Sequence, residues 1–84
     1  MNVRELAEGL EALLMRERLA LKKCDARMVE RLQHEKHALL QVLTRSDDRV
    51  AVRAALAYLA EPMRENVLLR TQARDVGRHA VRNR

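Results

Sequence analysis

Residues 32–43 read LQHEKHALLQVL, and the spacing of this stretch predicts the fold. Apolar residues that recur at intervals of three and four lie on one face of an α-helix. The leucines of the stretch have this spacing, at positions 32, 39, 40 and 43. We therefore expect a helix whose leucines face a core, while the four residues His34–His37 mostly face outward.

The same four residues are one position short of HExxH, a zinc-binding motif of metalloproteases. That motif places two histidines four residues apart, so that both reach one metal ion from one helix face. Here the histidines are three residues apart. A site built from Glu30, His34 and His37 would need a further ligand, and the nearby Lys36 and Arg31 would repel a cation. We predict a solvated helix face, with no metal site and no cofactor.

The rest of the chain shows few features of a catalytic site. Its two glycines are isolated, so no glycine-rich loop is present to hold a phosphate. Cys24 falls at the predicted end of a helix, where the helix dipole disfavours a reactive thiolate. A short helical chain also offers little concave space for a substrate. We therefore predict that the protein is not an enzyme.

Length and composition predict a single helical domain over residues 1–84. Apolar residues make up 48% of the chain and charged residues 35%, with two glycines and one proline, which favours long helices. No apolar run approaches the roughly 18–20 residues of a membrane span. The N-terminus lacks the apolar segment of a secretory signal, and a single cysteine forms no internal disulfide. We therefore expect a cytoplasmic protein.

Apolar periodicity predicts two helices in the first half of the chain. The first spans about residues 3–23. Its apolar residues form a line along one face, the seam, which the polar Glu17 interrupts. Asp25 is the best N-cap candidate for a second helix over residues 26–44. We expect a tight bend near Cys24–Asp25, although no glycine or proline enforces it and a continuous helix is the alternative.

A third helix is predicted over residues 47–80, with residues 81–84 as a frayed tail. Ser46 is its predicted cap, because Asp47 and Asp48 would then place negative charge in the first turn. The apolar stripe continues through Pro62, which predicts either one kinked helix or two helices nearly in line. Together the elements predict an all-α fold, an antiparallel helical hairpin extended to a three- or four-helix bundle with coiled-coil-like packing.

The third helix carries more apolar surface than a three-helix core needs. Its apolar residues cover more than one face, at Leu56, Leu59, Met63, Val67, Leu68 and Leu69. This surplus either closes a homodimer or four-helix core, or forms a docking surface for the amphipathic helix of a partner. Asn66 lies on the same stripe, where a lone asparagine costs stability and can fix helix register.

Arginines recur every fourth residue near the C-terminus, at positions 70, 74, 78 and 82. Residues 70–84 hold five arginines and one aspartate, which accounts for four of the net charge of +5. Such a ladder can contact phosphates or an acidic protein, and cations also suit the end of a helix. Without interleaved aromatic residues or a helix-turn-helix spacing, nucleic-acid binding is the less favoured alternative.

Three segments of the sequence carry a family resemblance. They are Glu17-Arg18-Leu19-Ala20-Leu21 before Asp25, then the pattern L..EK..LL..L from Leu32 to Leu43, and Asn66-Val67-Leu68-Leu69. Over about residues 3–80 the chain resembles the flagellar export chaperones of the FlgN type. The resemblance implies a small cytoplasmic type III secretion chaperone that holds the C-terminal helical ends of hook–filament junction proteins unpolymerised and delivers them to the export gate.

The expected partners are therefore a hook-associated export substrate and the export gate, with no small-molecule substrate. The resemblance and the apolar stripe together place the partner-binding surface on the third helix. Its predicted residues are Leu59, Met63, Asn66, Val67, Leu69, Arg70, Ala73, Arg74 and Val76. A structural homo-oligomer with coiled-coil packing is the first alternative, and a basic nucleic-acid-binding accessory protein is the second.

Overall fold

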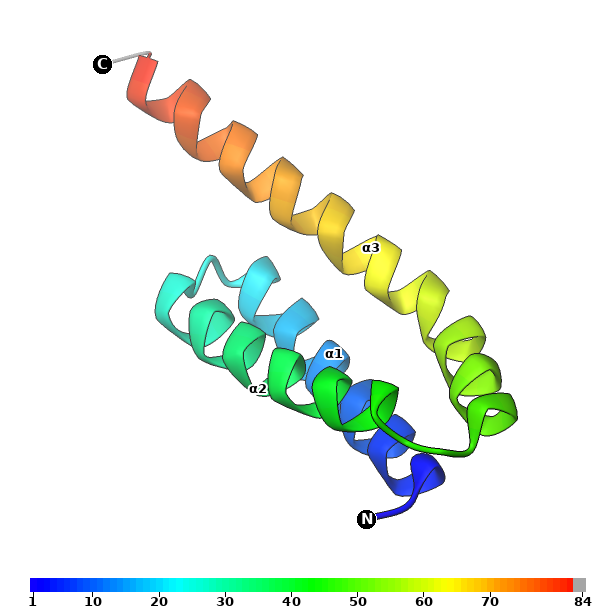
Figure 1. Cartoon of the computed structure of the whole chain (residues 1–84). Helices are drawn as coiled ribbons and strands as arrows, with labels where there is room; N and C mark the ends of the chain where they lie inside the picture. The colour runs from blue at the N-terminus through cyan, green and yellow to red at the C-terminus, as the bar shows by residue number, and fades with distance from the viewer. Residues whose placement is uncertain (83–84) are drawn as a thin grey trace.

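The computed structural model describes the backbone of residues 1–82, and side-chain burial and contacts for residues 1–72. Over the described backbone the chain is all-helical, with α1 (Val3–Lys22), α2 (Ala26–Thr44) and α3 (Arg49–Arg82). The molecule is 53 Å long and 20 by 17 Å across. Figure 1 shows α1 and α2 side by side as a hairpin, while α3 follows α1 and projects past the α1–α2 turn.

The turn between α1 and α2 lies where the sequence predicts a bend. The backbone N–H of Cys24 donates to the carbonyl of Leu21 at 3.1 Å, and that of Asp25 donates to Ala20 at 2.9 Å. Cys24 has a φ of 57°, so these bonds form a Schellman ending with a non-glycine residue in the left-handed conformation. The Asp25 carboxylate then accepts from the N–H of Met28 at 3.2 Å and caps α2.

The cap of α3 differs from the prediction, which assigned it to Ser46. The carboxylate of Asp48 accepts from the N–H of Ala51 at 3.1 Å, so Asp48 is the residue that caps α3. Ser46 Oγ instead accepts from the N–H of Asp48 at 3.3 Å and stabilises the loop. The helix therefore begins at Arg49, and it continues through Pro62 without a break.

The apolar core has two parts, and α1 contributes to both. Where the three helices meet near the N-terminus of α1, the buried residues are Leu6, Leu10, Leu14, Leu43, Val52, Ala55 and Leu59. Nearer the α1–α2 turn, a second cluster joins α1 to α2 through Leu13, Ala20 and Leu32. With leucine as its main residue, this core depends on regular helix packing rather than on aromatic side chains.

Contacts between α1 and α3 show that these two helices run parallel. Tyr58 on α3 lies close enough to Glu11 on α1 for this carboxylate to raise the pKa of the phenol. Two turns further along both helices, Arg18 donates to Glu65 at 2.6 Å. Since α1 ends at Lys22, about one turn later, the last dozen or so residues of α3 extend roughly 18 Å beyond it at 1.5 Å per residue.

Candidate functional site

The predicted partner-binding residues divide between the core and the surface of α3. Leu59 and Asn66 are completely buried within the chain, so neither is available to a partner in this conformation. Met63 packs against the core, and Leu69 and Arg70 are partly buried. Three further predicted residues, at positions 73, 74 and 76, have side chains outside the described part of the chain.

An exposed apolar strip remains on α3, and we define it as Leu56, Val67 and Leu68. Val67 was among the predicted partner-binding residues, whereas Leu56 and Leu68 were not. Leu56 and Val67 share one face, since they lie three turns apart, and Leu68 adjoins Val67. Among residues 49–72, Val67 is therefore the one predicted partner-binding residue whose side chain is exposed.

A buried polar cluster lies between the helices, where all three contribute a charged or amide side chain. It consists of Glu17 on α1, Lys36 on α2 and Asn66 on α3, all of them buried. Lys36 Nζ lies 3.2 and 3.3 Å from the two carboxylate oxygens of Glu17. Gln33 Nε2 also donates to this carboxylate, at 2.5 Å, so its charge is both paired and hydrogen-bonded.

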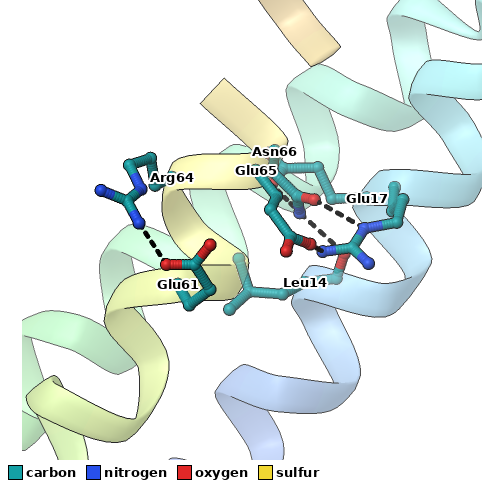
Figure 2. Close-up of polar contacts among 7 residues, drawn as sticks. Leu14, Glu17, Glu61, Arg64, Glu65 and Asn66 are labelled. Carbon is teal, nitrogen blue, oxygen red and sulfur yellow. Dashed lines mark hydrogen bonds and ion pairs between the residues drawn. The ribbon is translucent and has the colours of Figure 1, made fainter. Parts of the chain in front are cut away.

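Asn66 joins α3 to α1 through both ends of its amide, as Figure 2 shows. Its Nδ2 donates to Oε1 of Glu17 at 2.9 Å and to the backbone carbonyl of Leu14 at 2.8 Å. Its Oδ1 accepts from Arg18 Nε at 3.1 Å, and the same guanidinium binds Glu65. The surrounding partners therefore define which side of the amide is oxygen. The Arg64–Glu61 pair lies outside this cluster, on the exposed surface of α3.

The position of Lys36 corrects the expectation that residues His34–His37 mostly face outward. His34, Glu35 and His37 are exposed, but Lys36 is buried against Glu17. Lys36 lies one turn after Leu32 and therefore on the same inward face. The spacing of Leu32, Lys36 and Leu39 is therefore enough to place this lysine on the buried face.

The cluster is suited to structure rather than chemistry, because its polar atoms already bind one another. Within the part of the chain that the structure describes, no three of the residue types His, Cys, Asp and Glu gather closely enough to hold a metal ion. Over the same residues, no helix combines the length and the apolar character needed to cross a membrane. The arrangement holds the three helices together.

Comparison of the chain with protein-family models, curated proteins and solved structures finds no match. The likeness to FlgN-type chaperones stays a prediction from the sequence. Functional interpretation therefore depends on the helices themselves, above all on the unequal lengths of α3 and the hairpin.

Proposed function

We propose that the protein is a non-enzymatic helical chaperone or adaptor that binds the amphipathic helix of a partner along α3. The observation that carries this proposal is the length of α3, which has 34 residues against 20 in α1 and 19 in α2. The sequence keeps apolar residues at helical spacing at positions 69, 73, 76 and 80, and most of these lie beyond the end of α1. The backbone of α3 thus continues past the hairpin over the part of the sequence that has this spacing.

The mechanism is burial of the partner's apolar face against the exposed strip Leu56, Val67 and Leu68 and the turns that follow. Complete burial of one leucine or valine side chain contributes about 1.5–3 kcal/mol. Apolar side chains on both helices must therefore be buried together before the contact exceeds the cost of association. The incoming helix would be the fourth, which gives the four-helix, coiled-coil-like arrangement that the sequence pattern predicts.

The resemblance to FlgN-type chaperones supports a particular partner class. In that case the bound helix is the C-terminal end of a hook–filament junction protein, which would be held unpolymerised before export. The arginines from Arg70 onward would attract an acidic partner and speed its association.

Calorimetric titration with C-terminal peptides of hook-associated proteins tests the proposal. We expect binding in the micromolar range, and Val67→Ser should weaken it about tenfold, the equivalent of about 1.4 kcal/mol. Val50→Ser is the matched control, because Val50 is also an exposed valine on α3 but lies at its N-terminal end, 17 residues before Val67. Absence of heat at several hundred micromolar peptide would refute the export-chaperone assignment.

The exposed strip also fits a second copy of the chain, which is the alternative of a structural homo-oligomer. Light scattering across a hundredfold dilution separates the two. A chaperone with a free α3 should stay at the mass of one chain, 9.7 kDa, until a partner peptide is added. A dimer that persists at nanomolar concentration would bury the strip and favour the structural alternative.

A further inference from the structure

The tip of the α1–α2 hairpin has a surface depression that is separate from the strip on α3. All the residues that line it belong to the hairpin, namely Arg16, Leu19, Ala20, Lys23, Asp25 and Met28. Leu19, Ala20 and Met28 give it an apolar lining, and Leu19 is 57% exposed although it is a large apolar side chain. Arg16 and Lys23 also line it, seven residues or about two helical turns apart, with Lys23 as the C-cap of α1.

Exposed charge around this depression is predominantly positive. From residue 15 to residue 31, five exposed cations (Arg16, Lys22, Lys23, Arg27 and Arg31) stand against the two exposed carboxylates of Asp25 and Glu30. Asp25 is already engaged as the cap of α2, and Glu35 lies 3.9 Å from Arg16. At the other end of α1 the balance is reversed, with Glu5, Glu8 and Glu11 against Arg4.

Helix stability accounts for only part of this charge. Lys22 and Lys23 are at the C-terminal end of α1, where the helix dipole favours cations. Arg27 lies in the first turn of α2, where the dipole disfavours a cation, and no acidic side chain occupies that turn. The concentration of cations at the tip is therefore more than a consequence of helix ends.

We propose that the hairpin tip is a second docking surface, which binds an acidic amphipathic helix of a partner protein. One large apolar side chain of that helix would enter the depression between Leu19 and Met28. Carboxylates on either side of it would pair with Arg16 and Lys23. Because these cations are seven residues apart with Leu19 between them, an antiparallel ligand helix needs two carboxylates seven residues apart with its apolar residue between them.

A protein helix fits this surface better than a phosphate polymer or a lipid surface does. The depression is concave and has an apolar lining, which suits one inserted side chain. Single-stranded nucleic acid is usually bound through aromatic residues that stack on its bases, and the single tyrosine of the chain lies on α3. The proposal is independent of partner binding along α3, since the two surfaces share no residue.

The test uses the whole protein, labelled with ¹⁵N, and two synthetic helical peptides. One peptide contains Glu-x-x-x-Leu-x-x-Glu, and the other has glutamine in place of both glutamates. We expect the acidic peptide to shift the amide resonances of Arg16, Leu19, Lys23 and Met28, and to bind at least tenfold more tightly than its glutamine counterpart. Its affinity should fall as salt is added.

A pair of leucine variants gives a matched control. Leu19→Ser should reduce acidic-peptide binding at least tenfold, whereas Leu68→Ser should leave it unchanged, although Leu68 is exposed to nearly the same extent, 58%. Circular dichroism of each variant establishes that it is folded. Val67→Ser, which tests partner binding along α3, should also have no effect at the tip, so the two proposals fail independently.

Three outcomes would overturn the proposal. The first is equal binding of the acidic and glutamine peptides, and the second is a set of shifts confined to α3. The third is that neither peptide binds at millimolar concentration while phosphatidylglycerol vesicles or single-stranded DNA shift the tip resonances. That result would assign the tip to a lipid surface or to nucleic acid instead.

Discussion

Asn66 on α3 donates its Nδ2 to the Glu17 carboxylate on α1 at 2.9 Å, and both side chains are buried. Glu17 in turn is paired with Lys36 on α2, so one buried carboxylate holds all three helices. A shift of α3 by one turn would separate Asn66 from Glu17 and from the carbonyl of Leu14. Because buried polar groups without partners are costly, the cluster favours a single axial position of α3 along α1.

The first prediction concerns Asn66→Ala, which removes both donor hydrogens and the acceptor for Arg18. We expect the free energy of unfolding to fall by about 2–3 kcal/mol, because Glu17 and the Leu14 carbonyl lose a buried donor. Urea denaturation followed by circular dichroism measures this change. Gln41→Ala, an exposed amide on α2, is the control and should change the stability by less than about 0.5 kcal/mol. An equally small effect of Asn66→Ala would contradict the role of the cluster.

The second prediction tests the Glu17–Lys36 pair by a double-mutant cycle. Lys36→Met leaves a buried carboxylate with neutral donors only, and should cost about 3–5 kcal/mol. Adding Glu17→Leu removes the isolated charge, so the double variant should be more stable than Lys36→Met alone. If Lys36→Met does not fold, recovery of a cooperative transition in the double variant gives the same answer. If the double variant loses as much stability as Lys36→Met and Glu17→Leu lose separately when added together, the two residues are not coupled.

The sequence contains enough local information to predict the helices and the break near Cys24–Asp25. Caps and apolar spacing act within a few residues, so α1 and α2 begin and end within one residue of the predicted bounds. The start of α3 is less well determined, because Ser46 and Asp48 are competing caps in the same loop. The hydrogen bond from the N–H of Ala51 to the Asp48 carboxylate identifies Asp48 as the cap.

The buried cluster needed information that local patterns lack. Glu17 and Asn66 could be placed on apolar seams, but their pairing depends on how α1 and α3 are aligned across a sequence separation of 49 residues. The same alignment buries Leu59 and leaves Val67 exposed, although both lie on the predicted surface. The depression at the hairpin tip was also not predicted, because it arises from residues on α1, the turn and α2 together.

A third prediction follows from the backbone of Cys24. A side chain at a φ of 57° is disfavoured by about 1 kcal/mol or more, whereas glycine adopts this conformation freely. Cys24→Gly should therefore raise the free energy of unfolding by up to about 1 kcal/mol, and Cys24→Val should lower it. Urea denaturation in reducing buffer measures both, with Cys24→Ala as a control that keeps the Cβ atom. Destabilisation by glycine would contradict the left-handed turn.

The fourth prediction concerns the ionisation of Tyr58, the only tyrosine in a chain without tryptophan. The Glu11 carboxylate, as a hydrogen-bonding partner and then through its negative charge, raises the pKa of Tyr58 above the ordinary 10.0. Ultraviolet titration of the tyrosinate band measures this pKa directly. Glu11→Ala should return it toward the ordinary value, whereas Glu8→Ala should not, since Glu8 pairs with Arg4 instead.

The sign of the accompanying stability change follows from the raised pKa. The folded chain holds the phenol proton more tightly than the unfolded chain does, so the contact stabilises the fold at pH values below the unfolded pKa of about 10. This stability is lost as the pH rises through the higher, folded-state pKa. Urea denaturation of the parent chain and Glu11→Ala at pH 8 and at high alkaline pH should therefore show a difference that shrinks as the pH rises. If Tyr58 has the same pKa in the parent chain and in Glu11→Ala, the predicted effect of Glu11 on Tyr58 is wrong.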